Sequence, residues 1–412
     1  MTTFFEPIIQ ANDKKNFIRL KGHPTPLKFA RELYTQQCPL SVIDAETLKL
    51  IQVLRLHTTI DHTVSMTGSA VLLRSLIQPS TDLGYIRSKQ EALKEIASNE
   101  KLRQALQDFV DEFSKGESAL YKFFNKDLYA LFPYHDVKKA RQSAANMVKA
   151  RQTIPAAETS YLRGLMANLR VYEGSPIDRM MSGSIYRTFK GLKASDEVGL
   201  FTPKQKFIPH RFSKWLPAGP AVALSPYLYN TMGFGPPLSP LMSILGLVWT
   251  GLYVFYSLGI KPVKDTGNFI EPFREKCVQD QAFSHAVDAV GMIDELLSCH
   301  GFAGQVSHAT TLPTVTNDAH HAFEASGLTN PILAKEKPEC VPNDVKMNGT
   351  RLSFISGPNS GGKTTICKSI VQNQLLAQMG SYVLADKATI NIADMIRYQA
   401  PKFDGLQDDE GR

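Results

Sequence analysis

The sequence predicts a mainly α-helical core domain followed by the start of an α/β domain built around a phosphate-binding loop. Two observations predict this order. Apolar residues recur at three- and four-residue spacing from residue 41 to residue 106, which is typical of packed helices. A short apolar run at 351–356 has the pattern of a buried strand and leads directly into a glycine-rich loop and another helical pattern.

Composition narrows the class of protein. The chain has 412 residues, of which 43% are hydrophobic and 21% charged, and these values exclude a largely disordered chain and a multi-spanning membrane protein. The five cysteines contain no CxxC pair, which argues against a disulfide framework or a structural zinc site and favours a reducing compartment. Residues 1–14 include Glu6 and Asp13 and lack the apolar run of a signal peptide, so we expect a cytoplasmic location.

The helical part is predicted in two blocks. In the first, residues 78–82 end one helix and offer a cap for the next, namely Ser80, Thr81 or Asp82. Two to four helices follow by residue 169, with breaks at Pro133 and Pro155. In the second block, residues 282–297 carry an apolar stripe. This stripe consists of Val287, Val290, Ile293 and Leu297.

Positive charge is concentrated between the two blocks. Residues 136–214 contain 15 Lys and Arg against 6 Asp and Glu, a surplus of +9, whereas the whole chain carries +7. Such a surplus attracts either nucleic-acid phosphates or an anionic membrane face, and charge alone does not separate the two. A solvated helical face with no partner is the third alternative. The candidate contact residues are Lys138, Lys139, Arg141, Lys149 and Arg151.

An uncharged stretch follows this basic block. Residues 215–260 form a run of 46 residues without Asp, Glu, Lys, Arg or His. Its second half, residues 241–260, is 20 residues long, about what a helix needs to cross a hydrocarbon core of roughly 30 Å. Prolines interrupt the first half, and lysines or arginines flank both ends, so a membrane hairpin with both ends in the cytosol fits the pattern. The alternative is an apolar hairpin buried within a soluble fold.

The strongest motif is a complete match to GxxxxGK[ST] directly after the predicted strand. It comprises Gly357, Pro358, Asn359, Ser360, Gly361, Gly362, Lys363 and Thr364. The glycines let backbone N–H groups surround a β-phosphate, Lys363 neutralises the β- and γ-phosphates, and Thr364 supplies a hydroxyl for Mg²⁺. Residues 365–376 have helical spacing, so the helix dipole also favours the phosphates. The motif therefore predicts nucleotide phosphates and Mg²⁺ as ligands.

Hydrolysis needs more than this loop. A carboxylate at the end of a second strand normally holds the magnesium and positions water, and the sequence shows no such residue on an apolar strand. Only 56 residues run from Gly357 to the end, whereas a parallel-sheet nucleotide-binding domain typically needs more than roughly 100. We expect the chain to hold only the first part of that domain, and the catalytic residues stay unassigned.

The loop also carries a family resemblance. Gly357 to Thr365, Gly-Pro-Asn-Ser-Gly-Gly-Lys-Thr-Thr, resembles the GPNMGGKST loop of the MutS DNA mismatch repair ATPases. Residues 380–385 resemble the GSYVPA strand of that family, and residues 408–412 resemble its DD..GR segment. Residues 56–96 are similar to its helical lever core. The loop resemblance implies a nucleotide contact for Thr365. Residues 341–344 resemble the segment that borders the adenine, which implies nucleotide contacts for Val341 and Pro342, although Cys340 replaces the usual aromatic.

This resemblance implies a dimeric, ABC-type ATPase whose nucleotide state moves long helices that clamp double-stranded DNA. A homodimer is expected if the ATPase domain is complete. The implied organisation is an N-terminal segment (1–40), the first half of the helical core (41–135), an inserted basic and apolar segment (136–264), the second half of the core (265–325) and the beginning of the ATPase domain (326–412).

Two functions remain open at this point. The leading interpretation is a MutS-like, ATP-binding, DNA-associated protein of mismatch repair or recombination, with nucleotide state coupled to lever movement. The chain differs from the family pattern in two places. The residues before 41 leave no room for a mismatch-reading domain, and residues 136–264 occupy the place of the DNA clamp. The alternative is therefore a membrane-anchored, nucleotide-gated scaffold that does not read mismatches and associates with the membrane through residues 215–260.

Overall fold

The structure is a computed structural model, and it describes residues 42–124, 133–199, 201–209, 221, 224, 240–319, 321–349, 352–358 and 361–399. The predicted N-terminal segment (1–40), nearly all of the first half of the uncharged run, and the acidic residues at 408–410 lie outside the described residues.

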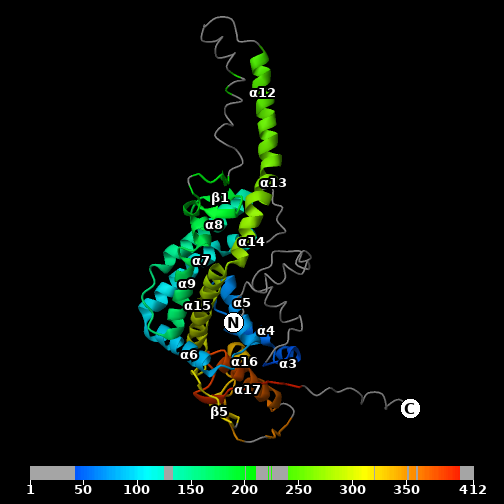
Figure 1. Cartoon of the computed structure of the whole chain (residues 1–412). Coiled ribbons are helices and arrows are strands. Elements are labelled where there is room, and N and C mark those ends of the chain that lie inside the picture. The colour runs from blue at the N-terminus through cyan, green and yellow to red at the C-terminus, as the bar shows by residue number, and fades with distance from the viewer. Residues whose placement is uncertain are drawn as a thin grey trace, which may run out of the picture.

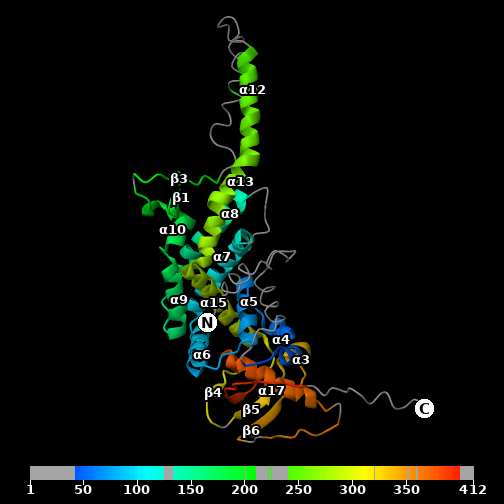
Figure 2. The same cartoon turned by 45° about the vertical axis from the view of Figure 1, so that its right-hand side comes forward.

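An elongated helical body separates two different ends of the molecule. A small sheet with α16 and α17 lies at one end, and α12 projects from the other (Figures 1 and 2). The body contains α3 (Ala45–Leu50), α4 (Val53–Ile60), α5 (Met66–Ile77), α6 (Leu83–Ser98), α7 (Glu100–Phe124), α8 (Pro133–Arg151), α9 (Ser160–Tyr172), α10 (Pro176–Ser182) and α15 (Gln281–Gln305). One continuous hydrophobic cluster runs through these helices into the small sheet.

The helices follow the predicted pattern. The stripe predicted on 282–297 is buried in α15, which packs against α5, α9, α6 and α7. Of the three predicted caps, the structure uses Asp82, whose carboxylate accepts hydrogen bonds from the N–H groups of Gly84 and Tyr85. Pro133 begins α8, and Pro155 lies between α8 and α9, as predicted. The helical part of the fold prediction is confirmed.

Two helix crossings are unusually close because glycines form them. A Cβ atom added at Gly291 of α15 would lie 2.6 Å from a Val71 methyl of α5, and one added at Gly68 of α5 would meet the Asp294 carboxylate. On the other side of the body, a Cβ added at Gly116 of α7 would meet Ser143 of α8. Helix α8 packs along α7, and α9 packs on α15, so these two helices belong to the helical body.

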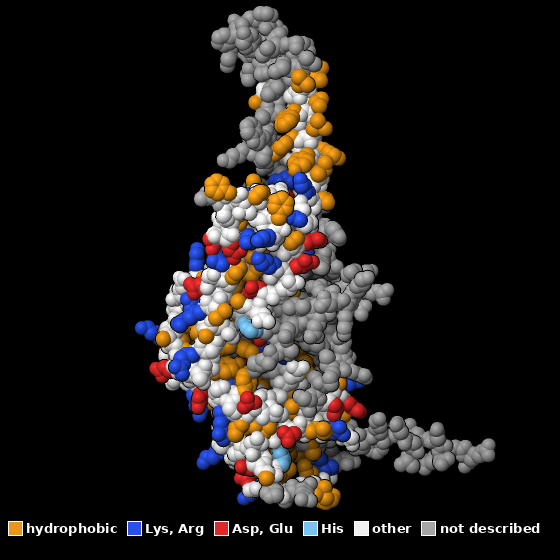
Figure 3. Space-filling view, viewed as in Figure 1, with side chains coloured by type: hydrophobic (Ala, Val, Ile, Leu, Met, Phe, Trp, Pro, Cys, Tyr) orange, Lys and Arg blue, Asp and Glu red, His pale blue; other side chains and the backbone are white. Residues whose placement is uncertain are grey.

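At the projecting end, a single helical run connects α12 to the body. It consists of α12 (Pro240–Phe255), the π-helical segment η3 (Tyr256–Ile260), α13 (Lys261–Asp265), the π-helical segment η4 (Thr266–Ile270) and α14 (Glu271–Gln279). Most large apolar side chains between residues 244 and 260 are exposed (Figure 3). For this half of the uncharged run, the alternative of a buried hairpin is wrong, because no described element covers the helix.

A three-stranded antiparallel sheet lies beside the base of this helix. It contains β1 (Ile185–Thr188), β2 (Gly191–Ala194) and β3 (Gln205–Lys206) in the order β2-β1-β3, with the short 3-10 helix η2 (Ser195–Glu197) after β2. Phe207, just after β3, stacks on Phe269 of η4 with ring centroids 5.1 Å apart. This contact joins the sheet to the helical run.

The opposite end holds a four-stranded mixed sheet in the order β4-β7-β5-β6. Its strands are β4 (Thr314–Thr316), β5 (Ala322–Leu328), β6 (Asn343–Asn348) and β7 (Lys387–Asn391), accompanied by α16 (Pro331–Glu336) and α17 (Lys363–Gln378). Strands β4 and β7 are parallel, and the other two pairs are antiparallel. These elements give the expected α/β part beside the helical part.

Two strand predictions in this part are wrong. Residues 352–356 are irregular, with Leu352 and Phe354 exposed, and Arg351 lies outside the described residues. A strand exists only where a neighbour accepts and donates its backbone hydrogen bonds, and no described strand pairs with this segment. Residues 380–385 also form no strand. They contribute a single bridge, from Val383 to Thr311, and the strand β7 begins later at Lys387.

Candidate nucleotide-binding site and its contacts with the helical body

The phosphate-loop motif leads into α17 through a left-handed residue. Gly362 precedes the helix with φ +78°, a conformation that favours glycine, and Lys363 is the first helical residue. Gly361 N–H donates to the carbonyl of Pro358 at 2.9 Å and closes the turn. Asn359 and Ser360 lie outside the described residues. The loop therefore presents the N-terminus of a four-turn helix, as the motif requires.

The ammonium group of Lys363 lies on the loop itself. Its Nζ donates to the carbonyl oxygens of Gly357 at 2.5 Å and Pro358 at 2.6 Å. The Lys363 ammonium thus donates to two carbonyl oxygens at this position, and the same donors can bind phosphate oxygens. Thr364 is exposed on the first turn of α17, so its hydroxyl is accessible to an ion. The residues present fit MgATP.

A cavity of about 650 Å³ connects the loop to the segment around β6. This volume falls within the range of roughly 300–1,000 Å³ that ligand pockets usually have. The lining includes Val341, Asn343, Lys346, Lys363, Thr365 and Ile366. The structure thus brings Val341 and the loop, predicted separately from the sequence, to one hollow, while Pro342 is exposed beside it.

Cys340 also lines this cavity, at the position where the resemblance leads one to expect an aromatic side chain. Its Sγ lies 3.5 Å from Nε2 of His308, and the same ring nitrogen lies 3.1 Å from the Cys340 carbonyl oxygen. Burial raises the pKa of the Cys340 thiol, so the group stays neutral. The imidazole of His308 fixes this corner of the cavity from the loop after α15.

Helix α17 carries the loop at one end and contacts the helical body along its length. Gln372 is buried, and its Nε2 donates to the Ile51 carbonyl between α3 and α4 at 2.9 Å. Its Oε1 accepts from Nδ2 of Asn330, also at 2.9 Å. At the last residue of α17, Gln378 Nε2 donates to the Ser80 carbonyl between α5 and α6 at 3.1 Å. Two loops of the body are therefore hydrogen-bonded to the helix that starts at Lys363.

Helix α16 adds a second connection, to α4. Lys335 Nζ donates to the carbonyl oxygens of Thr58 and Thr59 at 3.2 and 3.0 Å, at the C-terminus of α4, where a cation is favoured. Arg55 forms an ion pair with Glu336 on the same two helices. Just before α4, Gln52 has φ +60° and is the non-glycine residue with positive φ among the described residues. A left-handed residue, uncommon for a side chain other than glycine, therefore forms the turn between α3 and α4.

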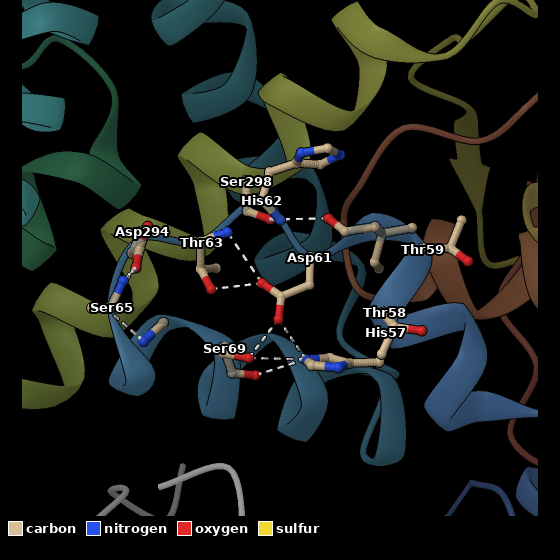
Figure 4. Close-up of polar contacts among 12 residues, drawn as sticks. His57, Thr58, Thr59, Asp61, His62, Thr63, Ser65, Ser69, Asp294 and Ser298 are labelled. Carbon is tan, nitrogen blue, oxygen red and sulfur yellow. Dashed lines mark hydrogen bonds and ion pairs between the residues drawn. The ribbon is translucent and has the colours of Figure 1, made fainter. Parts of the chain in front are cut away.

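The segment after α4 is fixed by buried polar contacts (Figure 4). Asp61 accepts hydrogen bonds from the hydroxyl groups of Thr63 and Ser69, both at 2.6 Å, and its Oδ2 lies 3.6 Å from Nε2 of His57. The Ser69 hydroxyl points to the carboxylate and lies 3.4 Å from the imidazole, so this group holds α4 against α5 and is not arranged as a nucleophile.

Asp294 of α15 secures the other side of this segment. Its Oδ2 accepts from the N–H of Ser65 at 2.8 Å and from the Ser65 hydroxyl at 2.5 Å, and its Oδ1 accepts from the N–H of Val64 at 3.2 Å. Burial raises the pKa of Asp294 to about 6 in spite of these donors. We did not predict this contact from the sequence, because its partners are about 230 residues apart. The Ser65 helix cap was the one local signal.

The basic residues predicted on α8 divide into two groups. Arg141 donates through Nε to the Met181 carbonyl at 2.8 Å, and burial lowers the pKa of its guanidinium. Arg151 forms an ion pair with Glu173 at 2.5 Å. Lys138, Lys139 and Lys149 are exposed. The two arginines therefore serve the packing of α8, whereas the three lysines remain available to a partner.

These observations define a class of protein: a long helical body joined to a small α/β part, in which the helix that follows the glycine-rich loop is hydrogen-bonded to the body. No family model matches the chain. It is 34% identical over 122 residues to the DNA mismatch repair protein MutS of Haloquadratum walsbyi, covering 30% of this chain and 13% of the relative. It is 24% identical over 432 aligned residues to MutS of Thermosynechococcus vestitus, covering 94% and 48%. It is 28% identical over 129 residues to the DNA mismatch repair protein MSH3 of Coccidioides immitis, covering 31% and 11%.

The chain is therefore a relative of MutS, and the matches support its membership of the MutS family. The resemblance inferred from the loop and the lever segment is confirmed. The match to MutS of Thermosynechococcus vestitus covers nearly all of this chain but only about half of that relative. The other two matches cover a smaller part of each relative.

Proposed function

We propose that this chain is a MutS-like protein of DNA repair that binds MgATP in the cavity between the phosphate loop and β6. The cavity carries the proposal, because it joins the phosphate donors of the loop to Val341 and Lys346 on a separate segment. In this assignment Lys363 exchanges the carbonyls of Gly357 and Pro358 for the β- and γ-phosphates, and the hydroxyl of Thr364 holds Mg²⁺. The ion neutralises phosphate charge.

The proposal is tested by the affinity for a fluorescent ATP analogue, measured by anisotropy. Lys363→Ala removes the cation that meets the phosphates, and we expect at least a tenfold loss of affinity, since charge-assisted hydrogen bonds contribute about 1.5–3 kcal/mol each. Lys368→Ala on the same helix is the control, because Lys368 does not line the cavity. Unchanged affinity in the Lys363 variant contradicts the assignment.

We further propose that nucleotide state is coupled to the helical body through α17. Any shift of the helix that begins at Lys363 changes the hydrogen bonds of Gln372 to Ile51 and of Gln378 to Ser80. Gln372→Met keeps the side-chain length and removes both amide bonds. We expect this variant to bind ATP but to lose any ATP-dependent change in hydrogen exchange of α4. An identical ATP-dependent exchange pattern in both proteins refutes the coupling.

Double-stranded DNA is the proposed macromolecular partner, and the exposed lysines of α8 support it. The test is the salt dependence of binding to duplex DNA. Replacing Lys138, Lys139 and Lys149 with Ala lowers the slope of log affinity against log salt by up to about 2.7 if each lysine contacts one phosphate. An unchanged slope excludes α8 as the contact surface. The resemblance also implies a homodimer, and light scattering with and without ATP tests this.

A membrane-anchored, nucleotide-gated scaffold is the second candidate, and α12 favours it. Among the described residues, one helical run is long and apolar enough to cross a membrane by length and composition. Its exposed apolar side chains, for example Leu245, Leu247, Trp249 and Leu252, spread over more than half of the helix circumference at about 100° per residue. A helix that docks on one protein partner needs only one apolar face, whereas lipid surrounds it. In this assignment the body lies at the cytoplasmic face.

A further inference from the structure

The three-stranded sheet β2-β1-β3 has two chemically different faces. Its inner face buries Ile185 and Leu192, and Arg187 on the same face donates to the Asn268 carbonyl of η4 at 2.8 Å. The outer face follows from the strand register, in which Tyr186 pairs with Lys193 on one side and with Lys206 on the other. Paired residues share a face, so two lysines flank a tyrosine on the outside of the sheet.

A third lysine joins this outer face. Lys204 lies over the Tyr186 ring, with Nζ 5.3 Å from the ring centroid. Asp196 and Glu197, which follow β2 in the sequence, form their ion pairs with Arg179. Lys193 and Lys206 lie on the two outer strands, on either side of Tyr186 in the central strand. A dense positive face of this kind is best explained by an anionic partner.

Two exposed phenylalanines accompany the lysines. Phe189 lies in the turn between β1 and β2 with 94% of its surface exposed, and Phe201, in the segment before β3, is fully exposed. An exposed phenylalanine is unfavourable in water, whereas an aromatic ring beside lysines suits the boundary between lipid headgroups and hydrocarbon. We call Tyr186, Phe189, Lys193, Phe201, Lys204 and Lys206 the basic-aromatic surface.

This surface lies at the end of the body from which α12 projects. Views 45° apart place β1 and β3 level with α13 (Figures 1 and 2), and hydrophobic and basic side chains gather around the base of the projecting helix (Figure 3). The position is fixed by packing, because Lys276 of α14 donates to the Leu192 carbonyl of β2 at 3.0 Å. Lys261 and Lys264 end the uncharged part of the helix at this same level.

We propose that the basic-aromatic surface docks on the anionic headgroups of the bilayer that α12 enters. The proposal rests on the membrane-anchored candidate function and adds the lipid class that the body recognises. Continuity with α12 favours lipid over nucleic acid, since the apolar residues 244–260 extend about 25 Å from this end at about 1.5 Å per residue. A bilayer contacts the helix and the surface together.

Flotation with lipid vesicles separates the anchor from the surface. The full chain on pure phosphatidylcholine vesicles tests α12, which enters hydrocarbon whatever the headgroup charge. Leu247→Glu with Leu252→Glu puts charge on two exposed positions of α12 and leaves the body untouched. We expect this double variant to lose binding to phosphatidylcholine, yet to bind vesicles with 30% phosphatidylglycerol reversibly through the basic-aromatic surface.

The decisive comparison is made in that double-variant background. Changing Lys193, Lys204 and Lys206 to Gln should lower the affinity for phosphatidylglycerol vesicles by about a hundredfold, given about tenfold or less per lysine at an anionic surface. The control changes three exposed lysines of α8 to Gln and removes the same charge elsewhere. A fall of equal size in the control means that net charge alone acts, and it overturns the proposal.

The other outcomes are equally distinct. One outcome is that the full chain floats with phosphatidylcholine vesicles while the double variant does not bind phosphatidylglycerol vesicles. In that case α12 is an anchor and the basic-aromatic surface does not bind lipid. If the three Gln substitutions abolish binding to duplex DNA and leave vesicle binding intact, the surface binds nucleic acid and the lipid proposal is wrong. Phe189→Ser with Phe201→Ser should weaken vesicle binding without affecting ATP affinity, and unchanged vesicle binding contradicts the role of the rings.

Discussion

Asp294 gives the most quantitative prediction. Its buried carboxylate joins α15 to the segment before α5, and burial raises the pKa from 3.8 to about 6. The folded protein therefore binds this proton more tightly than the unfolded chain does. The protonated group stabilises the fold fully below about pH 4, and that contribution is lost as the pH rises through 6. The shift corresponds to about 3 kcal/mol in total, of which about 1.5 kcal/mol is lost between pH 5 and pH 7.5.

Urea unfolding of the wild type and of Asp294→Asn at pH 5 and pH 7.5 measures this contribution. The amide does not titrate, so the difference in unfolding free energy between the two proteins should shift by about 1.5 kcal/mol, with the wild type relatively weaker at pH 7.5. Burial also raises the pKa of Glu117, which is present in both proteins, and the charge of Glu117 is one of the causes that raise the pKa of Asp294. A difference that stays constant within about 0.5 kcal/mol would show that Asp294 is charged in the fold throughout this range.

Three further predictions concern the helical body. Lys89 and Glu295 form a buried ion pair at 2.7 Å, so Lys89→Met should cost about 3–5 kcal/mol of unfolding free energy in urea, and adding Glu295→Leu should recover most of it; equal losses would contradict the pairing. Gly291→Val should cost about 1–3 kcal/mol in the same assay, since its side chain would clash with α5; no loss would mean that the helices separate easily. Arg141→Ala should lower the melting temperature, because Arg141 donates to two backbone carbonyls before β1. Lys139→Ala, at an exposed lysine, should leave the melting temperature unchanged. A larger effect of Lys139→Ala than of Arg141→Ala would refute this distinction.

The helices could be predicted because their signals are local. The stripe of Val287, Val290 and Ile293 is buried in α15 as its spacing indicates, and Asp82 caps α6 from the three residues offered. The segment 352–356 shows the limit of such reasoning. Its apolar composition resembles a buried strand, yet strand formation depends on a paired neighbour, which no local pattern reveals.

The candidate site likewise has a part that was predictable from local sequence and a part that was not. Gly362 and Lys363 were predictable because a phosphate loop is encoded in consecutive residues. Asp294 with Ser65 and Lys89 with Glu295 were not, since each pair joins residues more than 200 positions apart. A count of the charged residues on α8 also could not show which of their side chains are buried by packing. It grouped Arg141 with Lys139, although one guanidinium is bound inside the body and the neighbouring ammonium is exposed.

The positions of these groups suggest how the two ends of the molecule communicate. The loop helix α17 is bonded to the turns before α4 and after α5, and α5 is held to α15 by Asp294 and by the glycine crossing at Gly291. Helix α15 follows directly from α14, with the cap Asp280 between them, and α14 continues into α12. In the coupling proposed above, a movement of α17 on nucleotide binding would be transmitted to the base of α12 through these closely packed helices, which resist compression. In that proposal Asp294 joins the start of α5 to α15 through its hydrogen bonds with Ser65. Its replacement by Asn should thus weaken an ATP-dependent change near the basic-aromatic surface more than it weakens ATP binding itself.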